Sequence, residues 1–419
     1  MIQKLQDSSR RLLRWSETYF KGDMAYLMRG ASWLTVGQIT SSGLSLLVAI
    51  VCANLLTKDT YGLYKYMLSI ANLLSIFALP GMVSALTRSV ARGFEGSIVP
   101  ATKTSVSWSI LGSVVGCVVA VYYYAHGNTT LALALLIIAL LLPLFDSFTS
   151  FTAYYLGKSD FRGSVTANAI TQGGATLAVI SAVLLKGNIF ALLLAYFGSY
   201  SVLNLAYYLY TVRKIAPDAS VDPEVISYGK HLSVMSILGT VAANIDKLVL
   251  FHILGPVEVA IYSVTTAAPD QLKSVVGFLT TLLFPKFAQG DEVDAHSKMR
   301  HTFFLFSIAS VAAVITYVSL APLFFHIFFR QYQDVVFLSQ IFSLSLLTMA
   351  LDPATIFLSA RGKVKEQYWA NTMGYLLQIG GVIILAMYFG LVGVIAARII
   401  TRFVGNAINV YFYYHPFKT

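Results

Sequence analysis

Long apolar runs, separated by short polar turns, repeat along almost the whole chain. Twelve runs of about 20 to 26 residues can be drawn, at residues 31–56, 62–86, 102–124, 130–155, 164–185, 189–212, 229–253, 258–284, 302–326, 335–359, 366–388 and 391–414. At a rise of about 1.5 Å per residue, each run can cross roughly 30 Å of hydrocarbon as a tilted helix. The pattern predicts an all-α integral membrane protein with about 12 transmembrane helices.

A short polar hinge occurs twice, about 200 residues apart. Residues 55–64 (LLTKDTYGLY) separate the first two runs, and residues 253–262 (ILGPVEVAIY) separate the seventh and eighth. A repeat of this size predicts two related six-helix lobes. The expected organisation is therefore a leader at 1–28, an N-terminal lobe at 29–213, a linker at 214–228 and a C-terminal lobe at 229–419.

The leader and the composition both fit a membrane protein. Leu5, Leu12, Trp15 and Tyr19 fall near one helical face, which predicts an interfacial amphipathic helix; a disordered basic leader is the alternative. The chain is 57% hydrophobic and 11% charged, with a mean hydropathy of +0.71. So few charges cannot cover the outside of a soluble domain, which excludes that class. Tyrosines at span ends, among them Tyr61 and Tyr64, are interpreted as interfacial residues.

The basic residues predict the orientation. The net charge is +10, but these residues lie in loops between apolar runs, which argues against a nucleic-acid partner. In the predicted topology, 21 Lys and Arg lie on the side of the termini, four lie on the opposite side and four lie inside spans. The positive-inside rule therefore predicts that both termini are cytoplasmic, in a multi-pass protein of the cytoplasmic (inner) membrane. The loops on the opposite side are too short for a separate domain.

Several segments carry a resemblance to a known family. Residues 55–64 continue through YMLS at 66–69 and GMVSALTR at 81–88, and this stretch resembles the start of Wzx-like polysaccharide flippases. These flippases belong to the multidrug/oligosaccharidyl-lipid/polysaccharide exporter superfamily. Residues 244–247 (NIDK), 254–256 (LGP) and 261–263 (IYS) are similar to the opening of that family's second half. Thr57 and Lys58 replace the usual Gly-Pro or Gly-Glu of the first hinge, and two arginines in the last span exceed the expected charge.

The resemblance implies two lobes, of the MATE-like fold, that face each other across a central cavity. It implies alternating access that moves a polyprenyl-pyrophosphate-linked oligosaccharide to the outer leaflet, for O-antigen, capsule or exopolysaccharide assembly. The expected partners are this lipid-linked oligosaccharide, membrane lipid, and the polymerase and chain-length proteins of the same pathway. No cofactor, metal or enzymatic activity is expected.

Ionisable side chains inside the predicted spans are candidate site residues, because charge at membrane depth is costly unless it meets water or a partner. Arg398 and Arg402 lie four residues apart on one helical face, where like charges need an anionic partner. That partner is either a substrate pyrophosphate or a carboxylate such as Asp270 or Asp352. Asp270 and Lys273 are three residues apart, so they either neutralise each other or present Lys273 to phosphate.

The other candidates are more ambiguous. Asp246 and Lys247 are adjacent and cannot both line one helical face, so one faces the cavity or Lys247 extends to the interface. Asp146 follows Pro143 and is either a packing residue or a group that couples transport to protons or other ions. Asp270 and Asp352 are further candidates for such coupling.

A polar stripe accompanies these charges in the first two spans. Gln38, Ser42 and Ser45 share one face of the first span, and Asn72 and Ser75 follow in the second. The stripe either solvates sugars in a wet cavity or marks close helix packing.

The remaining function classes can be compared directly. No nucleophile–base set, metal-ligand spacing or phosphate-binding loop is present, which disfavours an enzyme and an ATP-driven pump. Cys52 and Cys117 lie within apolar runs and indicate buried side chains rather than a disulfide. An ion-coupled multidrug or metabolite exporter on the same scaffold is the alternative to a flippase. A membrane-embedded glycosyltransferase or polymerase would need a large outer loop with catalytic carboxylates, which this chain lacks.

Overall fold

The computed structural model describes residues 24–216, 219–281 and 292–415, and these residues are almost entirely helical. The predicted leader lies mostly outside them. The α-helices are α2 (Met24–Leu55), α3 (Lys58–Leu74), α4 (Gly81–Ala91), α5 (Ile98–Ala125), α6 (Thr129–Asp146), α7 (Ser150–Gly157), α8 (Phe161–Leu184), α9 (Ile189–Leu193), α10 (Ser199–Val212), α11 (Val225–Leu254), α12 (Pro256–Thr281), α14 (Glu292–Phe328), α15 (Val336–Ser343), α16 (Asp352–Ala360) and α17 (Val364–Tyr414). Short 3₁₀ or π segments interrupt several of them: η1 (Ser75–Ala78), η2 (Glu95–Ser97), η3 (Ser147–Thr149), η4 (Leu194–Gly198), η5 (Arg330–Val335) and η6 (Leu344–Leu351).

The predicted number of spans agrees with these helices. Nine segments of the described chain are long and apolar enough to cross a membrane, and the bent pair Lys58–Ala78 and Gly81–Ala91 makes a tenth. One of the nine, α17, has 51 residues and leaves helical geometry at Gly390, so it forms two spans. α12, a 26-residue helix that carries Glu258, Asp270 and Lys273 and is not among the nine, brings the number to the predicted twelve. The protein is therefore a multi-pass, all-α membrane protein.

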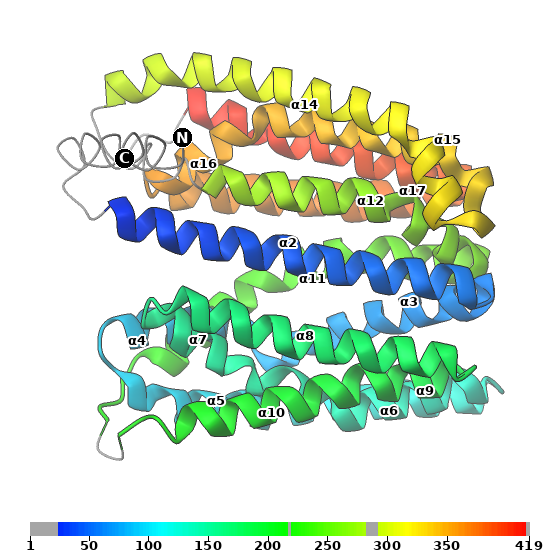
Figure 1. The fold of residues 1–419 in the computed structure, drawn as a ribbon, viewed down its shortest axis with the longest axis horizontal. Helices are drawn as coiled ribbons and strands as arrows, with labels where there is room; N and C mark the ends of the chain where they lie inside the picture. The colour runs from blue at the N-terminus through cyan, green and yellow to red at the C-terminus, as the bar shows by residue number, and fades with distance from the viewer. Residues whose placement is uncertain (1–23, 217–218, 282–291, 416–419) are drawn as a thin grey trace, which may run out of the picture.

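The helices run along one axis in two groups (Figure 1). α5, α6, α8 and α10 lie together in one group, and α12, α14, α16 and α17 lie in the other. α3 and α4 of the first group pack against α12 and α11 of the second. α2 begins and α17 ends at the same end of the bundle, as an even number of spans requires. We call this the linker end, because residues 213–216 and 219–224 also lie there, and we call the opposite end the hinge end.

At the hinge end the two repeated hinges touch each other. Gly62 faces the carbonyl oxygen of Pro256 so closely that a Cβ atom would lie 1.7 Å from it. Tyr61 and Tyr64 are 0% and 1% exposed and pack in a core that both groups share, with Ala260 and Tyr332. The interpretation of these two tyrosines as interfacial residues is therefore wrong, because both side chains are buried within the protein: Tyr61 lies near Tyr332, and Tyr64 packs against Tyr196 of its own group.

Asn54, near the end of α2, also joins the two groups of helices at the hinge end, through hydrogen bonds. Its side-chain amide donates to the carbonyl of Phe328 at 2.6 Å, and its Oδ1 accepts from the backbone N–H of Arg330 at 3.2 Å. Gln331 donates to the Asn54 carbonyl at 2.7 Å. These bonds connect α2 to the turn between α14 and η5, so the two groups are closed against each other here.

At the linker end, the connecting segment is fixed to the first group of helices. Asp222 is buried, and it accepts a hydrogen bond from Ser89 of α4 at 2.7 Å. Its backbone N–H donates to Ser97 at 2.8 Å, and Arg92 lies 3.5 Å from its carboxylate. The bond from Ser89 is the main reason that the pKa of Asp222 lies below the usual aspartate range. The part of the linker around Asp222 is thus held against the first group of helices by hydrogen bonds and an ion pair.

Candidate functional site

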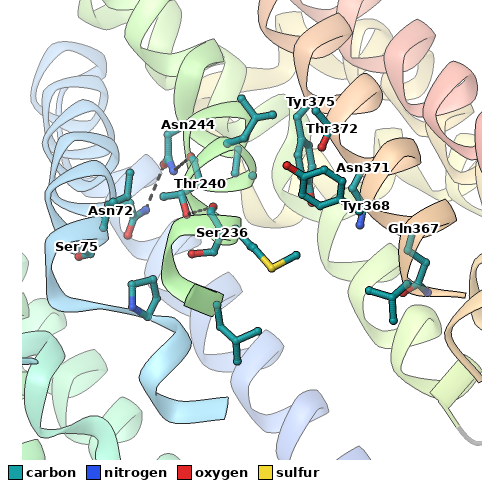
Figure 2. A pocket seen from close by; sticks show the side chains of 18 residues that line it. Asn72, Ser75, Ser236, Thr240, Asn244, Gln367, Tyr368, Asn371, Thr372 and Tyr375 are labelled. Atoms are coloured by element: carbon teal, nitrogen blue, oxygen red, sulfur yellow. Dashed lines mark hydrogen bonds between the residues drawn. The ribbon is translucent and has the colours of Figure 1, made fainter. Parts of the chain in front are cut away.

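A groove of about 660 Å³ lies between the two groups of helices (Figure 2). Asn72 and Ser75, from α3 and η1, form one side, and residues 364–375 of α17 form the other. Between them, Ser236, Thr240 and Asn244 of α11 point into the groove. Both halves of the chain therefore contribute to one polar recess.

The lining of the groove is polar but uncharged. Asn72 donates to the Oδ1 of Asn244 at 3.2 Å, which joins α3 to α11 at one edge. The opposite wall carries five polar side chains: Gln367, Tyr368, Asn371, Thr372 and Tyr375. Tyr368 is 50% exposed, so much of its ring is open to a ligand. Among the described residues that line the groove, none is Asp, Glu, Lys, Arg or His.

Of the residues that the sequence singles out, Asn72 and Ser75 line the groove. On the opposite wall, polar residues recur at 367, 368, 371, 372 and 375, and on α11 they recur at 236, 240 and 244. This spacing places each set on one helical face. The signal was present in the sequence, but polar stripes of this kind also occur where helices pack closely.

Arg402 of α17 forms an ion pair with Asp270 of α12. Its Nη2 lies 2.7 Å from Oδ1, and its Nη1 donates to Ser345 at 2.9 Å. The guanidinium also lies over the ring of Phe342, 5.0 Å from the centroid. Asp270 therefore pairs with an arginine 132 positions away and not with Lys273, its neighbour in sequence. The carboxylate partner that stacked arginines require comes from the protein itself.

Arg398 has a carboxylate of its own. Its Nε lies 3.6 Å from the Oδ2 of Asp246, which is 2% exposed and accepts a hydrogen bond from Tyr262. Lys247 lies on a different face of α11, close enough to Lys65 of α3 for the two charges to interact. The adjacent residues Asp246 and Lys247 thus face different surroundings, as the 100° turn between them predicts.

The other charged candidates in this half also have polar partners. Lys273 donates to Thr348 at 3.1 Å, and Asp352 accepts from Asn406 at 3.1 Å. Asn406 also donates to the carbonyl of Thr348 at 2.9 Å. These contacts link α12, η6 and α17 into one network together with the two arginine–aspartate pairs.

The two remaining candidates contact other elements. Gln38 donates to Ser274 of α12 at 2.7 Å, so it bridges the two groups of helices away from the groove. Asp146 ends α6 and accepts a hydrogen bond from Ser75 at 2.5 Å. α6 continues through Pro143 to Asp146 and then tightens into η3.

In the described part of the chain, no group of three or more His, Cys, Asp or Glu residues is placed to hold a metal ion.

Comparisons with known proteins identify the family and the fold of this chain. The profile of the family described as "Polysaccharide biosynthesis protein" matches residues 27–291. A multidrug resistance MATE family transporter of the MOP superfamily, in an inward-facing conformation, superposes with a TM-score of 0.66 at 13% identity, over 91% of this chain and 97% of that one. A MATE in complex with MaD5 gives 0.65 at 15% identity, over 94% and 96%.

A third similar structure is described by the polarity of its binding pocket. It is a MOP superfamily transporter from Pyrococcus furiosus, for which a binding pocket of reverse polarity and a different function are suggested. It superposes with a TM-score of 0.61 at 14% identity, over 93% of this chain and 95% of that one. No curated protein sequence matches this chain. At these identities the structures establish the MATE-like fold alone.

Proposed function

The chain belongs to the polysaccharide biosynthesis protein family, and on that premise we propose that it is a flippase for a lipid-linked oligosaccharide. It would move a polyprenyl-pyrophosphate-linked repeat unit from the cytoplasmic to the outer leaflet of the inner membrane. The product would enter O-antigen, capsule or exopolysaccharide assembly, beside the polymerase and chain-length proteins of that pathway. The sequence leaves either the pyrophosphate or a carboxylate of the protein as the partner of Arg398 and Arg402, and phosphate or Asp270 as the partner of Lys273; both arginines have carboxylate partners.

The single observation that carries this proposal is the lining of the groove. Amide and hydroxyl groups both donate and accept hydrogen bonds, which suits the hydroxyl groups around a sugar ring. Tyr368 and Tyr375 add apolar ring faces with a polar tip, which suits the C–H face of a sugar. A groove of about 660 Å³ falls in the usual size range of ligand sites, roughly 300–1,000 Å³.

The alternative, an ion-coupled exporter of drugs or small metabolites, uses the same scaffold. A pocket for cationic drugs needs a carboxylate that is free to pair with the drug. In the described chain, Asp246 and Asp270 are held by arginines and Asp352 is hydrogen-bonded to Asn406. Asp146 has no such cationic partner in that part of the protein, but it lines a separate cavity of about 160 Å³ and not the groove. The described residues that line the groove present no charge of either sign. This distribution favours an uncharged, hydroxyl-rich glycan in the groove over a cationic drug.

Transport would proceed by rocking of two lobes, at 29–213 and 229–419, with the linker end in the cytoplasm. The described conformation is closed at the hinge end by the Gly62–Pro256 contact and by the hydrogen bonds of Asn54. In the proposed cycle these contacts separate when the glycan is released to the outer side, while the polyprenyl tail stays in lipid. Different affinities for the passenger in the two states would bias the motion.

The test is flipping of radiolabelled lipid-linked oligosaccharide by the purified protein in liposomes. The variant Asn371→Ala with Tyr375→Ala removes an amide and a ring from one wall, and we expect the flipping rate to fall at least tenfold. Tyr388→Ala is the matched control, because Tyr388 lies on the same helix, is 78% exposed and does not line the groove. Equal rates for wild type and the double variant would remove the groove from the substrate path. Transport of tetraphenylphosphonium without flipping would favour the exporter.

A further inference from the structure

A second, smaller cavity adjoins the groove inside the first group of helices. It has a volume of about 160 Å³ and is lined by Asp146 together with hydroxyl side chains of η1, α5, η3 and α7. These hydroxyl groups belong to Ser75, Thr102, Ser105, Ser147, Thr149 and Ser150. One carboxylate and six hydroxyl groups therefore surround a space that holds about five waters at roughly 30 Å³ each.

Asp146 differs from the other carboxylates at membrane depth. Arg398 lies 3.6 Å from Asp246, Arg402 lies 2.7 Å from Asp270, and the charge of Lys273 acts on Asp352. For Asp146, the described residues provide the hydroxyl of Ser75 and no cationic side chain within ion-pair distance. A carboxylate held in this way at membrane depth is costly unless a positive species compensates it.

We propose that this cavity binds one monovalent alkali-metal cation, with Asp146 as its charged ligand. A single carboxylate balances a single positive charge, which favours a monovalent over a divalent ion. Hydroxyl and carboxylate oxygens are hard ligands, which suit hard cations. Interrupted helices commonly supply cation sites in transporters through unwound carbonyls. Here α3 is interrupted by η1 and bends by 47° before α4, and α6 passes into η3 directly after Asp146.

The position of the cavity couples the cation to the groove. Ser75 and Pro80 line both spaces, so the short segment η1 is a wall that the two share. The Ser75 hydroxyl has two acceptors in reach, the Oδ2 of Asp146 at 2.5 Å and the Ala71 carbonyl at 2.9 Å. A cation on the carboxylate would change the balance between these two hydrogen bonds and so the orientation of a hydroxyl group that also lines the groove. Occupation of the cavity would therefore change the groove without touching the glycan.

The experiment measures binding of ²²Na⁺ to the full-length protein in lipid nanodiscs, with NaCl, KCl and choline chloride as competitors at constant ionic strength. We expect saturable binding of about one ion per chain in the wild type. Asp146→Asn should weaken it at least a hundredfold, and Ser75→Ala should change the affinity at least threefold. Asp59→Asn, which removes an exposed carboxylate from the first turn of α3, is the control and should bind as the wild type does.

Three results would overturn the proposal. They are equal ²²Na⁺ binding by wild type and Asp146→Asn, displacement by choline as effective as by Na⁺, or a thermal stability that responds to pH alone and not to Na⁺ or K⁺. The last result would assign the site to a proton. If Asp146→Asn does not fold, an unchanged ²²Na⁺ affinity in Ser75→Ala would also overturn the proposal. No oligosaccharide is present in this assay, so its outcome is independent of the flippase proposal.

Discussion

Replacing Gly62 with alanine should open the hinge end of the bundle. The added Cβ would lie 1.7 Å from the Pro256 carbonyl oxygen and 3.2 Å from the Ala260 nitrogen. Because real Cβ atoms essentially never approach a neighbour within 3.0 Å, the helices must separate by about 1.3 Å, the difference between 3.0 and 1.7 Å. The clashing atoms belong to the backbone and cannot rotate away.

The size of the effect follows from this geometry. Overpacking in a dense interior costs about 1–3 kcal/mol, and a clash with backbone should fall at the upper end. If the cost of about 3 kcal/mol applies to the closed conformer alone, it changes the equilibrium between the closed and an open conformer roughly a hundredfold. A hundredfold change would turn a protein that is about 10:1 closed into one that is about 1:10 closed, and the groove itself would not be altered.

Spin labels at positions 55 and 337 can report this change by pulsed electron paramagnetic resonance. Leu55 and Phe337 are 57% and 68% exposed near the hinge end, on opposite sides of the interface. Cys117→Ser is the background, and Cys52 is fully buried. Gly43→Ala is the control, because a Cβ there meets nothing within 4 Å. A distance distribution in Gly62→Ala that matches the control would show that the Gly62–Pro256 contact does not hold the end closed.

Three further changes test other features. Arg402→Ala should lower the free energy of unfolding by about 2 kcal/mol, which is less than for a fully buried pair because Asp270 is 37% exposed. The double variant Arg402→Ala with Asp270→Ala should recover most of the lost stability. A double variant as unstable as the single one would contradict the ion-pair explanation. Asp222 has a lowered pKa because Ser89 and the Glu224 N–H donate to its carboxylate. The stability that ionised Asp222 contributes is therefore fully present above its unfolded-state pKa of about 3.9. It is lost only as the pH falls through the lower pKa of the folded state. Hydrogen exchange of residues 219–224, corrected for intrinsic rates, should stay equally slow between pH 7 and 5 and should accelerate in Asp222→Asn; acceleration in the wild type at pH 5 would refute this. Gly390→Ala should reduce stability by about 1–3 kcal/mol, because φ 57° and ψ −134° are accessible to glycine only, and unchanged unfolding would mean that the two arms of α17 tolerate another turn.

Most of the fold could be predicted from the sequence because the membrane leaves few alternatives. An apolar run of 20 residues satisfies its backbone in lipid only as a helix, so the runs and their boundaries follow from composition. The interruptions at η1 and η3 could not be predicted with the same ease. Pro80 signals a break, yet the left-handed conformation of Leu79 is set by its surroundings and not by residue type.

The candidate site was only partly predictable, for a physical reason. Sequence spacing suggests which residues share a helical face, but it does not say which helix that face meets. Asp270 and Lys273 are neighbours in sequence, whereas the ion pair joins Asp270 to Arg402. The groove shows the same limitation, since a stripe such as Gln367, Asn371 and Tyr375 fits a cavity and a packed interface equally well. Only the tertiary arrangement separates these two cases.

The contact between the two hinges has a consequence for how the molecule is built. Under the 198-residue offset that relates the hinges, position 62 corresponds to position 260, and the structure places Gly62 against Ala260 itself. Contact between a residue and its own counterpart is what an approximate two-fold axis predicts, as in the isologous interface of a homodimer. We therefore expect the two halves of the chain to behave as the diverged subunits of a dimer. Separate expression of residues 1–216 and 219–419 should then yield halves that recognise each other.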